Sequence, residues 1–349
     1  MATRSRRGLW GWWWWGWAVT ISSVLVSMTP RVGYASEEQF PEPDGLAAAV
    51  RFWSATFTQY GYRDVLIHDR VQPGLVYEVV RDVGPDDDVR VQMAIQNAVE
   101  RVRRATRACG LSLFEPPASM LEPLARIRTH RGMREAFAQG IVAERLFRAP
   151  VRRALAAEQL PSDLAALPLV ESTYHPGLVS QAGAVGLWQL SVDVADRYVR
   201  VDAKVDERRD PLRASLAAAR YLRDLHEQFG SWPLALTAYN HGPTGVQRAR
   251  EVVGSDDIAD IVRRYDGPGF GFASRNFYAE FLAARHVLAH ADAYFPELRR
   301  GRFVTYKVKR GDTLERVARR HGVTIPSLRI ANGIRAALIR PGQTLLVRL

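Results

Sequence analysis

A single carboxylate at the end of an apolar helix is the most chemically suggestive feature of this 349-residue sequence. Glu171 lies seven residues after Leu164 and four after Leu167, so it shares their helix face. A helix that is apolar almost all round is buried. Burial raises the pKa of a carboxyl group, and a carboxyl that is protonated near neutral pH can act as a general acid. Glu171 is therefore a candidate catalytic acid. The alternative is that it caps a loop amide or meets an arginine.

The residues on either side of Glu171 predict where its helix begins and ends. Ser162 is a good N-cap before the apolar run, and Asp163 is favourable in the first turn. The segment from Tyr174 to Gly177, which contains a proline followed by a glycine, ends the helix. We therefore expect Glu171 in the last turn of a buried helix, where the chain opens into a loop.

Three further segments place glycine or charge at a predicted helix boundary, namely GAVGLWQ at 183–189, DERRDP at 206–211 and AYNHG at 238–242. In the first, Gly183 and Gly186 allow close backbone approach. In the second, Asp210 and Pro211 suit the N-cap and first position of a helix, so a salt-bridged helix start is the favoured interpretation and Glu207 is only a marginal site candidate. In the third, a tyrosine and an amide end a helix, which suits either a sugar-binding wall or a core tyrosine.

Together with VES at 170–172, these segments resemble, in order and spacing, the goose-lysozyme-like lytic transglycosylases, most closely the membrane-bound type D family. The resemblance runs from roughly Phe52 to Leu288. It implies a mainly α fold with a lysozyme-like, goose-type helical catalytic domain. It also implies that the substrate is peptidoglycan, which is cut between N-acetylmuramic acid and N-acetylglucosamine.

The resemblance further implies a mechanism with one carboxylate. Glu171 would protonate the glycosidic oxygen and then take a proton from the C6 hydroxyl of the same muramic acid, which closes a 1,6-anhydro ring. Ser180 would hydrogen-bond the substrate near Glu171. The other residues implied to contact substrate are Gly183, Gln189, Tyr239 and Asn240.

The sequence departs from the family's pattern at two places. Relatives often have tyrosine directly after an Arg-Asn pair in the last helix, whereas here Phe277 follows that pair and Tyr278 comes one position later. His241 replaces a commonly small residue beside Tyr239. We therefore expect a cleft hydroxyl that is either missing or supplied from another helix angle, and a changed cleft shape near Tyr239.

Two other functions stay open. A hydrolytic muramidase of the same fold would need a second carboxylate, and Asp193 and Asp196 follow on the next helix. Solvated helix positions are the favoured interpretation for both. A catalytically silent wall-binding scaffold is the second alternative, but it gives no reason for an acid in the apolar helix of Glu171.

Residues 303–349 predict a small βααβ module. The strands are expected at 305–308 and 344–347, and the helices at 314–321 and 324–331. With GDTL at 311–314 and PGQTL at 341–345, the pattern resembles a LysM module, a family that binds glycans containing N-acetylglucosamine. The resemblance implies glycan contacts by Gly311, Asp312 and Thr313, for which turn geometry and helix capping are the other expected role.

The N-terminus is typical of an export signal. Three arginines precede a charge-free apolar run at 9–28, and small residues flank a cleavage point before Ser36. The run is also long enough for an uncleaved membrane anchor. We therefore expect an exported protein of the periplasm or cell envelope, with its N-terminus either cleaved or held in the inner membrane by residues 9–28.

The net charge of +11 is unevenly distributed. Residues 1–35 hold four arginines and no acid, and residues 303–349 hold ten basic and two acidic residues, so the body between them is nearly neutral. A nucleic-acid partner would need a basic stripe across a fold, whereas a basic C-terminal module suits an anionic wall polymer. Cys109 is the only cysteine and is expected to be a core thiol. No metal or cofactor motif is recognised.

The predicted division of the chain is an export signal or anchor (1–35), a helical lead-in (36–150), a catalytic domain (151–295) and the LysM module (303–349). Residues 36–44 and 295–301 are expected to be linkers. Residues 76–80 are consistent with strand or helix. The predicted helices of the body cover 46–59, 88–108, 121–131, 133–159, 212–229, 232–239 and 274–291.

Overall fold

The computed structural model of the chain describes residues 39–84, 87–108, 123–298, 303–332, 334 and 339–348. The predicted export signal, the apolar run at 9–28 and Cys109 lie outside these residues. Within them, no helix is both long enough and apolar enough to span a bilayer.

The fold is mainly helical, as predicted. Before residue 160 the elements are η1 (Asp44–Leu46), α1 (Ala47–Thr58), β1 (Val65–Asp69), β2 (Val76–Val80), α2 (Asp88–Ala108), α3 (Pro123–Arg126), β3 (Ile127–Arg131) and α4 (Arg134–Ala157). The elements that follow are η3 (Ser162–Ala166), α5 (Leu167–Ser172), α6 (Val192–Ala195), η4 (Glu207–Arg209), α7 (Pro211–Phe229), α8 (Trp232–His241), α9 (Pro243–Val253), α10 (Ile258–Arg264), α11 (Phe272–Ala289), α12 (Ala291–Tyr294) and η5 (Pro296–Leu298).

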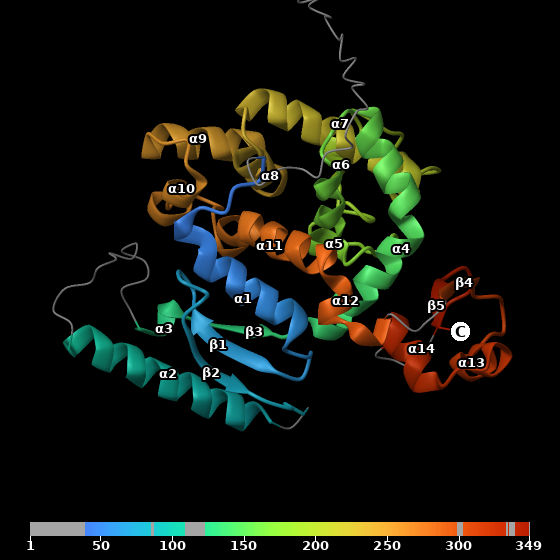
Figure 1. The fold of residues 1–349 in the computed structure, drawn as a ribbon, viewed down its shortest axis with the longest axis horizontal. Helices are drawn as coiled ribbons and strands as arrows, with labels where there is room; N and C mark the ends of the chain where they lie inside the picture. Colours follow the sequence, from blue (N-terminus) through green and yellow to red (C-terminus); the bar gives the residue numbers. More distant parts are fainter. Residues whose placement is uncertain are drawn as a thin grey trace, which may run out of the picture. The chain divides into compact units, whose positions relative to one another are not determined.

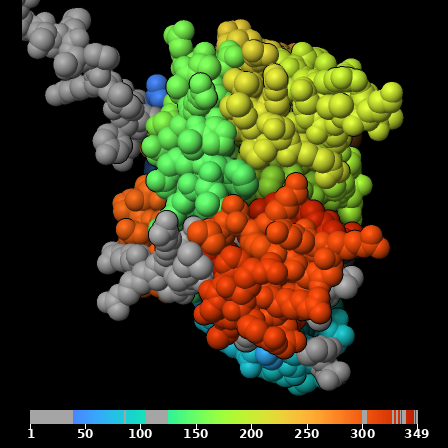
Figure 2. All heavy atoms as spheres, turned by 90° about the vertical axis from the view of Figure 1, so that its right-hand side faces the viewer, coloured from blue at the N-terminus to red at the C-terminus, as the bar shows by residue number. Residues whose placement is uncertain are grey.

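Helix α11 lies in the middle of the helical body (Figure 1). It packs against α1, α8, α5 and η3, and most of its side chains are buried, so it has almost no solvent face. Helices α4 and α7 pack against each other, and Figure 2 shows them side by side on one surface, α4 in green and α7 in yellow. One hydrophobic cluster joins these elements and includes residues from both the predicted lead-in and the predicted catalytic domain.

The start of α7 follows the sequence closely. Asp210 is its N-cap and accepts hydrogen bonds from the backbone N–H groups of Leu212 and Arg213. Pro211 is the first helical residue, and Gly230 ends the helix in the left-handed conformation. These boundaries are therefore confirmed.

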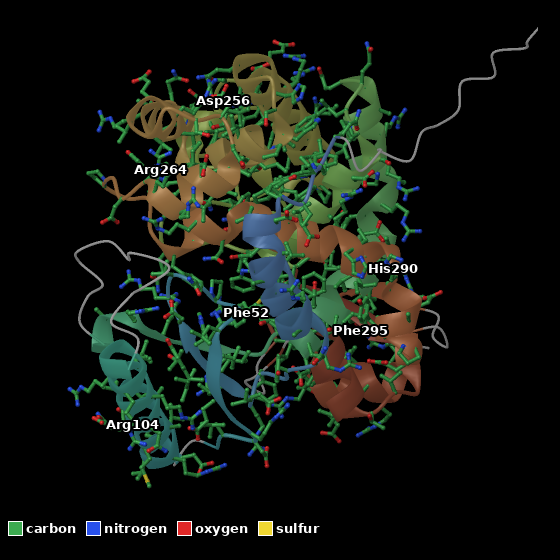
Figure 3. All side chains as sticks on the ribbon, turned by 60° about the vertical axis from the view of Figure 1, so that its left-hand side comes forward. Phe52, Arg104, Asp256, Arg264, His290 and Phe295 are labelled. Carbon is green, nitrogen blue, oxygen red and sulfur yellow. The ribbon has the colours of Figure 1, made fainter. Side chains whose placement is uncertain are left out.

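A three-stranded antiparallel sheet in the order β2-β1-β3 belongs to the lead-in, and the prediction of a helix over 121–131 is wrong for its second half. Strand β1 is buried along its whole length. Val65 and Ile67 face the α2 side, whereas His68 lies against Phe52 of α1, with ring centroids 4.6 Å apart. Figure 3 labels Phe52 on α1 above the strands. Helices therefore cover both faces of the sheet.

Both predicted linkers are wrong in the parts that the structure describes. Phe40 is buried against Trp232 and Phe281, with ring centroids 5.6 and 5.2 Å apart. At the other end, Phe295 and Leu298 are buried in the same core. These apolar side chains attach the ends of the helical body to its core because each removes a large apolar surface from water.

The C-terminal module has the predicted βααβ order, with β4 (Phe303–Lys307), α13 (Leu314–His321), α14 (Ile325–Asn332) and β5 (Thr344–Arg348). Strands β4 and β5 pair antiparallel. Gly322 ends α13 in the left-handed conformation, as its position predicts. The module has a hydrophobic core of its own, which includes Leu314, Val317 and Leu345.

We predict that acid destabilises the lead-in through His68 and His130. Burial lowers the pKa of each imidazole from 6.5 to about 4. The unfolded chain therefore binds more protons between pH 6.5 and 4, so stability is lost as pH falls through this window, by up to about 3 kcal/mol for each histidine. His68→Gln should flatten the pH dependence of the unfolding free energy measured with urea. The same change at the exposed His290 should leave it unaltered, and an equal effect of both variants would contradict the prediction.

Candidate active site

Glu171 lies in the last turn of α5, as predicted, but the helix begins differently from the expectation. The segment starts with the 3-10 turn η3, and Pro161 precedes it without a side-chain cap. The prediction that Ser162 is the N-cap is therefore wrong. Asp163 instead pairs with Arg285 of α11 at 2.6 Å, which ties this segment to the central helix.

The helix ends abruptly just after Glu171. Thr173 and Tyr174 both have left-handed backbone conformations, with φ values of 50° and 60°. The Tyr174 N–H donates to the carbonyl oxygen of Pro168, and its hydroxyl donates to that of Ala165 at 2.6 Å. A β-branched residue with positive φ is strained, so this conformation persists only because the surroundings, including the buried Tyr174 ring, determine it.

Ser172 connects this helix end to the glycine-rich loop at 183–189. Its buried hydroxyl donates to the carbonyl oxygen of Leu187 at 2.7 Å and accepts from the backbone N–H of His175. The serine of the Glu-Ser pair therefore fixes the loop beside Glu171.

The environment of Glu171 matches that of a general acid. The residue is partly buried, and protein surrounds its carboxyl group. Burial is the main cause that raises its pKa from 4.5 to about 8, and the charge of Glu280 adds to the shift. Within the described chain Glu171 has no hydrogen-bond or ion-pair partner. It therefore holds its proton at neutral pH.

Among the predicted site residues, Tyr239 interacts electrostatically with Glu171. Burial, the charge of Glu171 and Tyr221 all raise the pKa of Tyr239 well above its usual value. Its hydroxyl donates to the carbonyl oxygen of Trp188 at 2.7 Å. The Trp188 ring is fully buried and donates through Nε1 to Ser215 of α7 at 2.9 Å. Helices α7 and α8 thus hold the end of the glycine-rich loop.

The other predicted residues of this loop have structural partners. The Ser180 hydroxyl accepts from the backbone N–H of Ala184 at 3.0 Å and closes the turn that contains the exposed Gly183. Gln189 donates through Nε2 to the carbonyl oxygens of Leu178 and Gly186, at 3.3 and 2.9 Å. Among the described residues, neither Ser180 nor Gly183 makes a hydrogen bond to Glu171.

Arg208 explains what the DERRDP segment does. Its side chain is buried, pairs with Asp206 at 2.9 Å and donates to the carbonyl oxygens of Gly183 and Leu190. The segment therefore clamps both ends of the glycine-rich loop. Glu207 accepts from the backbone N–H of Arg200, which makes it part of the same scaffold.

The side chains of Asn240 and His241, which follow Tyr239, interact with Ser274 at the N-terminal end of α11. Asn240 accepts a hydrogen bond from the Ser274 hydroxyl at 3.1 Å, and the same hydroxyl lies 3.2 Å from Nδ1 of His241. Tyr278 is buried and donates to the carbonyl oxygen of Pro41, whereas Phe277 packs in the core. The hydroxyl of Tyr278 therefore serves the N-terminal segment of the fold.

Glu280 of α11 is a site residue that the sequence analysis missed. It is partly buried, and burial raises its pKa from 4.5 to about 8, with the charge of Arg128 opposing the shift. It is an isolated acid in an apolar helix, which is the signal that pointed to Glu171. Asp193 and Asp196, considered as second carboxylates, are both exposed.

The three predicted LysM residues shape the turn before α13. Gly311 has a φ of 85°, and Thr313 is the N-cap, with its side chain accepting from the N–H of Arg316. Asp312 accepts from the Tyr306 hydroxyl at 2.6 Å and from the backbone N–H of Lys309 at 2.7 Å. Turn geometry and capping are thus both present.

No cluster of three or more metal-ligating side chains occurs in the part of the chain that the structure describes.

Comparison with protein-family models identifies two domains. Residues 150–262 match the transglycosylase SLT domain, and residues 306–348 match the LysM domain. The chain therefore combines an SLT domain with a LysM domain.

Curated relatives share the SLT region. The chain is 35% identical over 92 residues to membrane-bound lytic murein transglycosylase D of Escherichia coli K12, which covers 26% of this chain but only 20% of that protein. It is 37% identical over 92 residues to a putative tributyltin chloride resistance protein of an Alteromonas species, covering 26% of this chain and 44% of that one. Among solved structures, the soluble lytic transglycosylase SLT70 of E. coli aligns over 44% of this chain and 24% of its own, at 21% identity and a TM-score of 0.34.

We predict that the two loop glycines differ in their tolerance of alanine. A Cβ at Gly186 would lie 2.1 Å from the carbonyl oxygen of Arg208, whereas a Cβ at Gly183 would meet nothing within 4 Å. Both have positive φ. Gly183→Ala should therefore cost about 1 kcal/mol of stability and Gly186→Ala about 3 kcal/mol or more. Urea denaturation of both variants measures this, and equal losses would refute the packing argument.

Proposed function

We propose that this protein is a peptidoglycan lytic transglycosylase in which Glu171 is the single general acid and base. The proposal is supported by a partly buried glutamate without a partner in the described residues, whose carboxyl group burial keeps protonated, within a transglycosylase SLT domain. The substrate bond is the β-1,4 link from N-acetylmuramic acid to N-acetylglucosamine. As the chain spans only a fifth of its E. coli relative, the proposal rests on the domain and the site.

In the first step, the Glu171 proton moves to the glycosidic oxygen as the bond from C1 of the muramic acid to that oxygen breaks. The N-acetylglucosamine leaves with a free hydroxyl, and Glu171 becomes a carboxylate. A pKa of about 8 favours this step, because most molecules then carry the acid form at neutral pH.

In the second step, the carboxylate takes the proton from the C6 hydroxyl of the same muramic acid while its oxygen bonds to C1. The product is a 1,6-anhydro ring, and Glu171 regains the proton that it gave. The nucleophile is part of the substrate, so proximity lowers the barrier, by up to about 7–11 kcal/mol in ideal intramolecular cases.

The remaining predicted residues would hold the glycan around this centre. Tyr239 and Gln189 meet the sugar through oxygen atoms, since their own protons are used within the protein. Ser180 retains a hydroxyl proton to donate, Gly183 offers exposed backbone, and Asn240 offers its amide N–H groups.

A hydrolytic muramidase of the same fold is the second candidate, and Glu280 favours it. Two carboxyl groups near the scissile bond are the usual equipment of glycosidases, with one of them activating water. The two mechanisms give different products, since hydrolysis adds one water that ring closure does not.

We also propose that the LysM domain binds peptidoglycan strands through the turn of Gly311, Asp312 and Thr313, and that the protein works in the cell envelope. Residues 9–28 would anchor it there if they are not removed.

Glu171→Gln should abolish glycan cleavage and leave folding and wall binding intact, because glutamine keeps the shape but cannot donate an acidic proton. Mass spectrometry of digested sacculi measures the products. The wild type should release muropeptides lighter by one water than hydrolytic products. Glu251→Gln, on the exposed face of α9, is the control that should stay active. Cleavage by Glu171→Gln would remove the assignment, and hydrated products would favour the muramidase.

Removal of residues 303–349 should weaken binding to whole sacculi while cleavage of soluble glycan strands continues, since the LysM domain has its own core. Co-sedimentation with sacculi and product release from soluble strands measure the two effects separately. Sacculus binding equal to that of the full chain would contradict the proposed role of the LysM domain.

A further inference from the structure

Glu280 has a position that its own helix does not explain. Its neighbours Ala279 and Phe281 are fully buried, and α11 packs on several other helices. Within the described residues no hydrogen bond or ion pair satisfies its carboxyl group. A carboxyl group in such a place costs stability, and groups of this kind are concentrated at functional sites.

The segments α5 and η3 both pack on α11, and across this contact the charge of Glu280 acts on Glu171. The Asp163–Arg285 ion pair joins one end of the two segments, and the two glutamates interact at the other end. Figure 1 shows α5 alongside α11 in this region.

Arg128 is a second charged residue that acts on Glu280. It belongs to β3, and its guanidinium group is 4.2 Å from the centre of the Phe272 ring at the start of α11. Its charge interacts with that of Glu280. No hydrogen bond from its guanidinium to another described residue is found, so its charge is available to Glu280. Glu171 interacts with Glu280 and Glu280 with Arg128, so these three charged groups, here called the polar row, link the SLT domain electrostatically to the lead-in sheet.

Arg70 repels Arg128, and the charge of Arg128 also acts on His68 and His130 of the lead-in sheet. The charged groups of the other packed elements have separate partners or are exposed. Asp163 and Arg285 neutralise each other, and Arg51, the only charged residue of α1, is exposed. From α8, Tyr239 donates to Trp188 and His241 lies beside Ser274. Arg128 is therefore the cation that acts on Glu280, and Glu280 in turn acts on Glu171.

Two neighbouring carboxyl groups in a partly buried site do not both ionise at neutral pH, because their charges repel and burial disfavours each charge. They titrate as a pair. Once Glu171 has donated its proton, a protonated Glu280 leaves one negative charge in the site. In that state Glu171 can act as a base.

We propose that Glu280 is a positioning residue of the active site that keeps the catalytic proton on Glu171, and that Arg128 sets how readily Glu280 itself becomes charged. The inference rests on the proposed function of Glu171. It adds to that function a carboxyl group from α11 and a cation from the lead-in, both outside residues 150–262.

Direct titration tests the inference without activity. Carbon-13 NMR of protein labelled at the glutamate side-chain carboxyl carbons follows Glu171, whose signal is assigned by its loss in Glu171→Gln. In Glu280→Gln, the apparent pKa of Glu171 should fall from about 8 by about half a unit or more, while burial keeps it above 4.5. In Arg128→Gln, the sum of the two apparent pKa values should instead rise. Asp196→Asn, an exposed change on the neighbouring segment, should alter neither.

The pH dependence of kcat/KM gives the functional reading. The alkaline limb should move to lower pH in Glu280→Gln, with anhydro products retained. An unchanged Glu171 titration in both Glu280→Gln and Arg128→Gln would overturn the inference and leave the proposed function standing. Hydrated products from the wild type that disappear in Glu280→Gln would also overturn it, because Glu280 would then be the base of a muramidase. A wild type without cleavage at any pH would remove the proposed function, whereas the titration would still decide whether the pair interacts.

Discussion

The site depends on one constraint, which is that a carboxyl group remains without a protein partner in a place where burial disfavours its charge. In the part of the chain that the structure describes, the two fully buried acids are paired, Glu144 with Arg148 and Asp69 with Arg126. Glu171 has no such partner in the described structure. Burial therefore disfavours its charged form and raises its pKa. The neighbouring architecture maintains this condition. Thr173 and Tyr174 end the helix soon after Glu171 through their left-handed conformations. The Ser172 hydroxyl donates to the carbonyl oxygen of Leu187 in the loop.

The sequence was sufficient to predict the features that depend on local pattern. Helix-end signals such as a proline, a glycine or the aspartate before Pro211 act within a few residues. The place of Glu171 near a helix end and the bounds of α7 and the LysM elements were therefore predicted nearly correctly. The 3-10 start of the Glu171 segment was not predicted. Asp163 there forms an ion pair with Arg285, which is distant in the sequence.

Features that depend on tertiary packing were missed. Strand β3 has no apolar alternation of its own, and it becomes a strand by pairing with the buried β1. Phe40 and Phe295 stood in stretches with prolines and charges that are typical of linkers, yet each fills a space in the core. Glu280 carried the same local signal as Glu171, but its significance appears only when α5 and α11 lie together.

The hydrogen bonds of Tyr239 and Gln189 have a consequence for recognition. The Tyr239 hydroxyl donates its only proton to the carbonyl oxygen of Trp188. The Gln189 amide nitrogen donates to the carbonyl oxygens of Leu178 and Gly186. The Tyr239 and Gln189 side-chain oxygens therefore remain as hydrogen-bond acceptors. In the proposed function, these two side chains would accept hydrogen bonds from the O–H and N–H groups of the glycan.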